Sequence, residues 1–132
     1  MKPALLLLTR LGAASCLAIS GVIHAQLYLH SYRMLPGVGP AFLLQASGAF
    51  AVALLLALNT TAVLRLAAAG LAAGALAGFI ASRTIGVFGF VEYGFQPAPQ
   101  ALISILVEAA ALGLLATLLH RPANSPAISP PH

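Results

Sequence analysis

The side chains with the greatest capacity for chemistry lie inside long hydrophobic runs. The stretch His24–Arg33 has two histidines, two tyrosines, a glutamine, a serine and an arginine. Further along the chain, Gln45, Ser104 and Glu108 are the notable polar residues of two other runs. A carboxyl group in a membrane helix is costly unless it faces other protein groups. Glu108 therefore marks either a functional site or a structural hydrogen bond between helices.

The two histidines of the first run suggest a haem or metal site, but their spacing argues against joint ligation. Six residues of helix correspond to about 600°, so His24 and His30 point to different sides. His24 instead shares a face with Tyr28 and Ser31. The only other helical histidine, His120, is expected at the opposite face of the membrane, so a haem-binding electron carrier is the least favoured function and no metal site is predicted.

The composition excludes a water-facing surface. Charged residues make up 6% of the 132-residue chain, hydrophobic residues 61%, and the mean hydropathy is +1.01. A soluble domain has roughly a quarter charged residues, so this exterior must face lipid. The net charge of +4 comes from scattered basic residues, which does not indicate nucleic-acid binding. No phosphate loop, HExxH or serine-protease set appears, so the sequence leans against an enzyme without deciding the question.

Four apolar runs must position the polar residues. They predict helices over about 8–30, 41–58, 62–82 and 100–119, each near the 20 residues or so that span a bilayer. We expect an all-α, four-helix transmembrane bundle over residues 1–120 and a disordered, proline-rich tail over 121–132. The first run also resembles a signal peptide, but Arg10 divides its apolar core and a retained helix is favoured.

The basic residues predict the orientation. The end that carries both termini has Lys2, Arg10, Arg65 and Arg121, whereas the opposite end has Arg33 and Arg83. Because cytoplasmic ends carry an excess of lysine and arginine, both termini are expected in the cytoplasm. The expected location is the plasma membrane, as a multi-pass protein.

Depth counting brings polar residues of three helices together. At about 1.5 Å per residue, His24, Gln45 and Glu108 lie roughly 9, 7 and 12 Å below the outer ends of their helices. This common depth predicts an outer-leaflet ligand site at His24, Tyr28, Gln45, Ser104 and Glu108. The rim is predicted at His30, Arg33, Arg83, Glu92 and Tyr93. Tyr32 is expected beside His30 and Arg33 as an interface anchor.

The connection from Ser82 to Gln100 is rich in glycine, proline and phenylalanine. We interpret it as a flap on the outer end of the bundle, with an aromatic belt at the membrane interface as the alternative. Glu92 is expected to pair with Arg33 or Arg83.

Three glycines of the third run, Gly70, Gly74 and Gly78, are spaced by four and share a helix face. Such a face favours close helix packing. We expect it to pack within the bundle, with a homodimer interface as the alternative.

Short motifs resemble a known family. They are Thr9-Arg10-Leu11-Gly12, then Gly21 with His24, and Gln45 to Gly48 at the start of a glycine- and alanine-rich run. Together they resemble the DoxX-like group of small four-helix bacterial membrane proteins, whose second helix commonly has an acidic residue where this chain has Gln45. The resemblance implies a bacterial inner-membrane protein close to quinone-dependent redox or oxidative-stress functions.

Three functions follow from these observations. The first is a non-catalytic subunit or binding module that holds a lipophilic molecule, such as a quinone or a lipid, in the outer-leaflet pocket. The second is a structural subunit that assembles into a homo-oligomer or larger membrane complex through the glycine face. The third is the haem-binding carrier.

Overall fold

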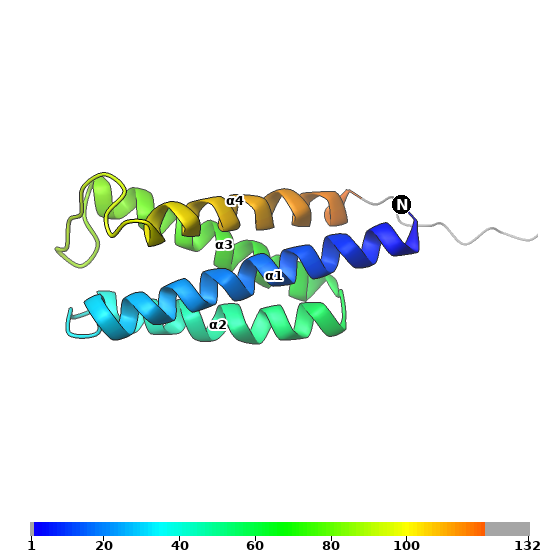
Figure 1. The fold of residues 1–132 in the computed structure, drawn as a ribbon, viewed down its shortest axis with the longest axis horizontal. Coiled ribbons are helices and arrows are strands. Elements are labelled where there is room, and N and C mark those ends of the chain that lie inside the picture. The colour runs from blue at the N-terminus through cyan, green and yellow to red at the C-terminus, as the bar shows by residue number, and fades with distance from the viewer. Residues whose placement is uncertain (1, 121–132) are drawn as a thin grey trace, which may run out of the picture.

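The computed structural model describes residues 2–120, so the predicted tail at 121–132 lies outside the described residues. These residues form four helices and no strand (Figure 1). In chain order the elements are α1 (Pro3–Leu27), the π-helical segment η1 (Tyr28–Tyr32), α2 (Val38–Leu58), α3 (Ala62–Arg83) and α4 (Gln100–Leu119). All four α-helices are long and apolar enough to cross a membrane. The prediction of an all-α, four-helix transmembrane bundle is confirmed.

Each helix packs against two others. α1 contacts α2 and α4, and α3 contacts the same two helices, so α1 and α3 lie diagonally across the bundle. The start of α1, the connection between α2 and α3 and the end of α4 lie together at one end, which we name the terminal end (Figure 1). The η1 segment and the loop between α3 and α4 lie at the other, the loop end.

Two helices begin earlier than the sequence predicts. α1 begins at Pro3 instead of residue 8, because proline is well suited to the first helical position. α2 begins at Val38, so Pro40 stands in the first turn, where its missing N–H is not needed. Gly37 directly precedes α2 and has a φ of 76°, and a Cβ at this position would lie 2.4 Å from the ring of Phe88. Glycine is therefore required at this turn.

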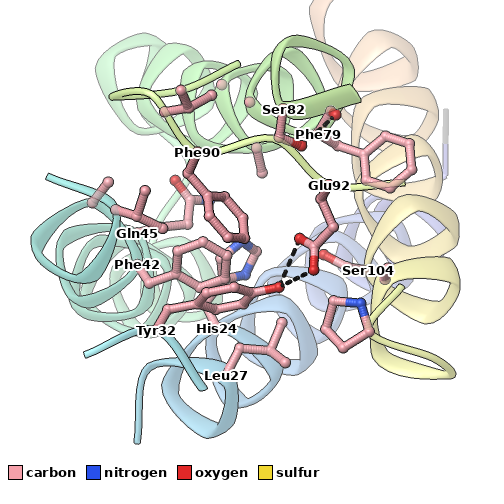
Figure 2. Close-up of a pocket in the computed structure, with 18 of the residues that line it drawn as sticks. His24, Leu27, Tyr32, Phe42, Gln45, Phe79, Ser82, Phe90, Glu92 and Ser104 are labelled. Carbon is pink, nitrogen blue, oxygen red and sulfur yellow. Dashed lines mark hydrogen bonds between the residues drawn. The ribbon is translucent and has the colours of Figure 1, made fainter. Parts of the chain in front are cut away.

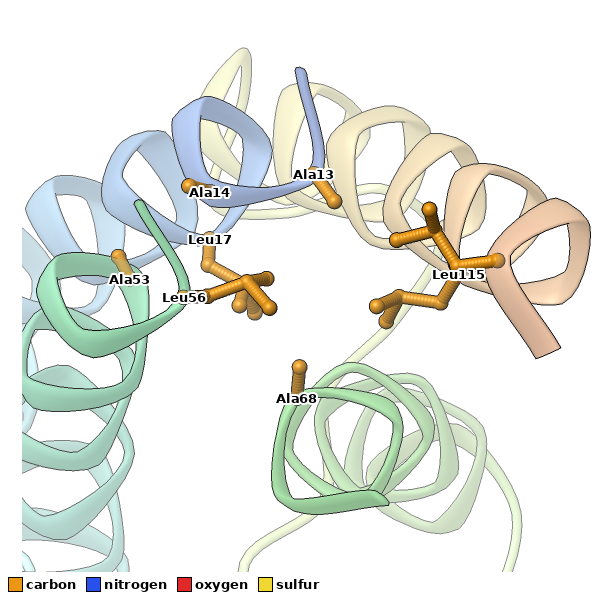
Figure 3. Close-up of a cluster of buried hydrophobic side chains, with 8 residues drawn as sticks. Ala13, Ala14, Leu17, Ala53, Leu56, Ala68 and Leu115 are labelled. Atoms are coloured by element: carbon orange, nitrogen blue, oxygen red, sulfur yellow. The ribbon is translucent and has the colours of Figure 1, made fainter. Parts of the chain in front are cut away.

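The terminal half of the bundle has a hydrophobic core of small and branched side chains (Figure 3). Alanines bring the backbones close and leucines fill the space between them. Its buried members are Ala13, Ala14, Leu17, Ala53, Leu56, Ala68, Leu115 and Leu118. We name this cluster the packed half.

The glycine face of α3 does not pack within the bundle, and that prediction is wrong. A Cβ added at Gly70, Gly74 or Gly78 would meet nothing within 4 Å. The reason is geometric: a spacing of four residues advances about 40° past a full turn at each step. Relative to the inward direction given by Ala68 and Ala72, the face turns from the outside of the bundle at Gly70 toward the α2 side at Gly78. The homodimer interface remains a prediction.

Candidate functional site

A cavity of about 200 Å³ lies between the helices at the loop end. All four helices and the α3–α4 loop contribute to its wall, which is mostly apolar (Figure 2). Four of the five predicted ligand-binding residues line it, namely His24, Gln45, Ser104 and Glu108. The fold thus brings together residues that are up to 84 positions apart in the chain, since 108 − 24 = 84.

Glu108 forms the polar floor of this cavity and is only 2% exposed. Its Oε1 accepts hydrogen bonds from the hydroxyls of Ser20 at 2.8 Å and Ser104 at 2.7 Å. Ser20 belongs to α1, whereas Ser104 lies one turn before Glu108 on α4. The carboxyl group therefore links two helices through one oxygen. Among the described residues its second oxygen, Oε2, has no hydrogen-bond partner.

His24 lies beside this carboxyl group. Its Nδ1 is 2.8 Å from the carbonyl oxygen of Ser20, and because a carbonyl only accepts, Nδ1 carries a hydrogen. The ring packs on Phe42 with centroids 5.2 Å apart. Nδ1 is 4.0 Å from Glu108 Oε1, beyond hydrogen-bond range. The other nitrogen, Nε2, has no partner among the described residues and is available to a molecule in the cavity.

A serine, a histidine and a carboxyl group within reach of one another suggest a nucleophilic set, but their hydrogen bonds run the wrong way. A catalytic histidine must accept the serine proton. Here Nδ1 of His24 already donates to a carbonyl, and the Ser20 hydroxyl donates to Glu108. The contact between Ser20 Oγ and His24 Nδ1, at 3.3 Å, provides no base for the hydroxyl. The arrangement holds the groups in place and leaves Ser20 unactivated.

A second polar layer covers the cavity at the loop end. Tyr32 donates its hydroxyl to the carboxylate of Glu92, at 2.7 and 2.9 Å from its two oxygens (Figure 2). The Tyr32 ring packs on Phe42 at 4.5 Å and edge-on to Phe90 at 5.6 Å between centroids. An aromatic roof with one partly buried hydroxyl–carboxylate link therefore joins η1 to the loop.

Arg83 fastens the loop from the side of α3. Its guanidinium is 3.9 Å from Glu92 and 3.8 Å from the centroid of Phe79. It also donates to the carbonyl oxygens of Gly94 and Gln96. Of the two expected partners of Glu92, the structure selects Arg83. The predicted flap is present, because Phe90 and Glu92 of this loop line the cavity.

Gln45 occupies the seam between α2 and α3. Its side-chain amide donates to the carbonyl oxygen of Leu71 at 3.0 Å. Just below, a Cβ at Gly48 would lie 3.1 Å from the Leu71 side chain, so the two helices approach closely there. Gln45 therefore closes the seam at the floor of the cavity while it contributes to the wall.

Four predicted site residues do not line the cavity: Tyr28, His30, Arg33 and Tyr93. Tyr28 is half-buried and stays outside the lining, although it follows His24 by one helical turn. Directly after it the helix changes to a π-helix, in which the Arg33 N–H bonds to the Tyr28 carbonyl oxygen at 3.0 Å. The wider turn contains one extra residue. Tyr32, rather than Ser31, therefore follows His24 on the inner face, and Tyr32 is 4% exposed. Its expected role as an interface anchor is wrong.

The other displaced residues point outward. His30 is exposed and bonds only to the carbonyl oxygen of Gln26, at 2.9 Å. Arg33 is exposed, and Tyr93 is 79% exposed. His24 and His30 thus lie on different sides, as the spacing predicts. The described residues contain no group of three histidine, cysteine or acidic side chains that could hold a metal ion.

Sequence reasoning missed three contributors: Ser20, Tyr32 and Phe42. Ser20 had a readable signal, because it lies one turn before His24 on the same face. Phe42 lies three residues before Gln45, which is also one turn. Tyr32 had no signal, since the π-helical turn that moves it inward has no recognisable sequence pattern.

No protein-family model, curated protein or solved structure matches the chain at a significant level. The class of protein defined by the fold and the cavity is a four-helix transmembrane bundle with a polar-floored pocket at one end. The resemblance to the DoxX-like group remains a prediction.

Proposed function

We propose that this chain is a membrane-embedded, non-catalytic binding module for a lipophilic molecule with a compact polar end, such as a quinone or a lipid. The observation that carries this proposal is the pairing of a mostly apolar cavity with two lining side chains, each of which has one polar atom without a hydrogen-bond partner among residues 2–120. These atoms are Oε2 of Glu108 and Nε2 of His24. Pockets that orient small molecules typically combine apolar walls with a few convergent polar groups.

The two atoms suit the polar end of such a ligand. Nε2 of His24 accepts a hydrogen bond when Nδ1 carries the hydrogen, which matches a ligand hydroxyl. Glu108 in its neutral form donates from Oε2 to a ligand carbonyl, and in its ionised form accepts from a hydroxyl. The ring of Phe42, packed between His24 and Tyr32, offers a flat aromatic surface beside them. A quinone ring and its reduced form present these groups on a flat body.

Ligand-dependent thermal stabilisation tests the proposal. The purified protein in mild detergent is heated with a panel of quinones and phospholipids, and binding is expected to raise the melting temperature. The variants Glu108→Gln and His24→Ala should lose most of that shift, because the first replaces the carboxyl group by an amide whose NH2 group cannot accept from a ligand hydroxyl, and the second removes Nε2. The control variant His30→Ala changes an exposed histidine six residues after His24, and it should retain the ligand-dependent shift in melting temperature. If no member of the panel stabilises the parent protein, the proposal fails.

We further infer an orientation in which the loop end faces outward and both termini are cytoplasmic, in a bacterial plasma membrane. The charge distribution and the resemblance to the DoxX-like group support this. Single cysteines are introduced at exposed Tyr93 and Lys2 after Cys16→Ser removes the native thiol. A membrane-impermeant maleimide applied to intact cells should label the cysteine at 93 and spare the one at 2. The reverse labelling pattern would show that the termini face outward and the loop end faces the cytoplasm.

A structural subunit of a larger membrane assembly is the second candidate. The observation that favours it is the open glycine face, where a Cβ added at Gly70, Gly74 or Gly78 would meet no neighbouring atom within 4 Å. α3 is also the least buried of the four helices, with 11% of its span buried in the chain. Mass measurement in mild detergent tests it. A monomer without a co-purifying protein would contradict it.

A further inference from the structure

We propose that the cavity opens sideways into the bilayer through a gap between α2 and α3, so that its occupant enters from the membrane and not from water. This lateral portal is bounded by Ala41 on α2 and by Gly74 and Gly78 on α3. The inference rests on the proposed binding function and narrows it, because it assigns the ligand to the class of membrane-dissolved molecules.

The first observation is that these three residues belong both to the cavity wall and to the outer surface of the bundle. Ala41, Gly74 and Gly78 line the cavity, and all three are also exposed on the outside of the bundle. A Cβ added at either glycine would meet no atom within 4 Å. The wall of the cavity therefore has no side-chain cover at this place.

The second observation is the direction of the gap. Taking Ala68, Ala72 and Ser82 as the inward face, Gly78 lies roughly 80° and Gly74 roughly 120° around the helix. Leu71 lies on the same side at roughly 60° and contacts α2 through Gln45 and Gly48. The glycines thus border the α2 seam, directly beyond the point where Gln45 and Leu71 close it.

The third observation is that several hydrogen bonds hold the α3–α4 loop over the water-facing end of the cavity, whereas few hold the α2–α3 seam. The loop is held by the Tyr32 hydroxyl, which donates to the carboxylate of Glu92, by the backbone bond from Glu92 N–H to Ser82 O at 2.9 Å, and by Arg83. The described portion of the α2–α3 seam has one side-chain hydrogen bond, from Gln45, and it lies at the floor. Entry through the seam breaks none of these bonds.

The cavity is also suited to a molecule that stays partly outside. A lipid-soluble ligand entering between α2 and α3 places its polar end on Glu108 and His24 and leaves its hydrocarbon part in the bilayer. The cavity of about 200 Å³ then needs to hold only the compact end. Small residues are required at the lateral portal, since larger side chains would fill it.

The absence of tryptophan from the chain permits a direct test. Phe42→Trp places a single fluorophore in the cavity wall. The protein is reconstituted in vesicles of palmitoyl-oleoyl-phosphatidylcholine, with or without phosphatidylcholine brominated at carbons 6 and 7 of one chain. Bromine quenches only on contact, so quenching reports acyl chains that reach the cavity.

Gly78→Leu in this background is expected to lower the quenching about twofold, because the added side chain covers the portal at contact distance. Gly74→Leu should have a similar but smaller effect. The matched control is Gly70→Leu, which makes the same change on the same helix roughly 160° from the inward face and outside the cavity wall. Equal quenching in Gly78→Leu and Gly70→Leu would overturn the portal.

A second measurement separates the portal from the binding function. Decylubiquinone also quenches tryptophan, and its association with the Phe42→Trp protein should be several-fold slower in Gly78→Leu than in Gly70→Leu. If Gly78→Leu blocks the brominated lipid but decylubiquinone never binds, the portal stands and the quinone proposal fails. If decylubiquinone binds at equal rates in both variants, the binding function stands and the portal is rejected.

Discussion

The two ends of the bundle use the same four helices in different ways. In the packed half, helices meet through alanine and leucine side chains, and Leu56 and Ala68 are fully buried. At the loop end, polar links join the helices at Ser20–Glu108 and Gln45–Leu71, and a third link, Tyr32–Glu92, joins η1 to the α3–α4 loop. Between these links lies the cavity.

The difference shows how a small membrane bundle can maintain an open site. Lipid is as apolar as a leucine side chain, so helices associate in the membrane through close packing and hydrogen bonds. The packed half supplies the close packing, which an open pocket lacks. The loop end then needs only enough directional bonds to fix the positions of Glu108 and His24. The close packing and the proposed binding site therefore lie at opposite ends of the same four helices.

The largest expected effect is on the packed half. Leu56→Ala removes a fully buried side chain and leaves a gap, with an expected loss of about 2–5 kcal/mol. The control Leu54→Ala makes the same change on the same helix at a side chain that is 64% exposed, and should cost far less. Thermal unfolding in detergent measures both. Similar losses would show that the packed half does not dominate stability.

The next largest effect is on the polar floor. Ser20→Ala removes one of the two hydroxyls that donate to Glu108, and a buried carboxyl group with one fewer partner costs about 2 kcal/mol. Ser15→Ala is the matched control, because this exposed serine on α1 bonds only to the carbonyl oxygen of Leu11. Unfolding of both variants should show a clear difference. If both variants are equally stable, the hydrogen bond from Ser20 to Glu108 does not contribute to the stability of the fold.

The architecture could be predicted from the sequence, because composition and run length set the number of membrane helices. Such a pattern does not depend on which neighbour a side chain meets. The end of α4 at Leu119 and the start of α3 at Ala62 agree with the prediction. The prediction that the glycine face packs within the bundle failed. Residues spaced by four drift around a helix, so Gly70, Gly74 and Gly78 do not all face one neighbouring helix.

The site could be predicted only in part. Depth counting brought His24, Gln45 and Glu108 to one cavity, since a straight helix rises by a fixed amount per residue. Tyr32 takes the place expected for Ser31 on the inner face, because a π-helical turn shifts that face by one residue. The selection of Arg83 over Arg33 as the partner of Glu92 depends on the path of a 16-residue loop, since positions 84 to 99 separate the two helices. Local sequence patterns do not determine that path.

A smaller effect is expected at the roof. Tyr32→Phe removes the hydroxyl that bonds to both oxygens of Glu92 but keeps the ring on Phe42, with an expected cost of about 1 kcal/mol. The change should be local, so hydrogen exchange measured by mass spectrometry should accelerate in residues 84–99 and stay constant in the packed half. Tyr93→Phe, at a mostly exposed ring, is the control. Uniform acceleration along the chain would contradict a roof that acts independently of the core.

The smallest effect compares one glycine from each half. Gly74→Ala adds a methyl group to open space at the cavity wall, and the higher helix propensity of alanine should stabilise the protein by up to about 1 kcal/mol. Gly12→Ala puts its methyl carbon 3.2 Å from Leu114 in the packed half, so most of that gain should be lost. Melting temperatures and detergent-complex masses of both variants are measured together. A Gly74→Ala variant that is less stable and lighter than the parent assembly would show that the glycine face is occupied by a partner, which would favour the assembly subunit over the open portal.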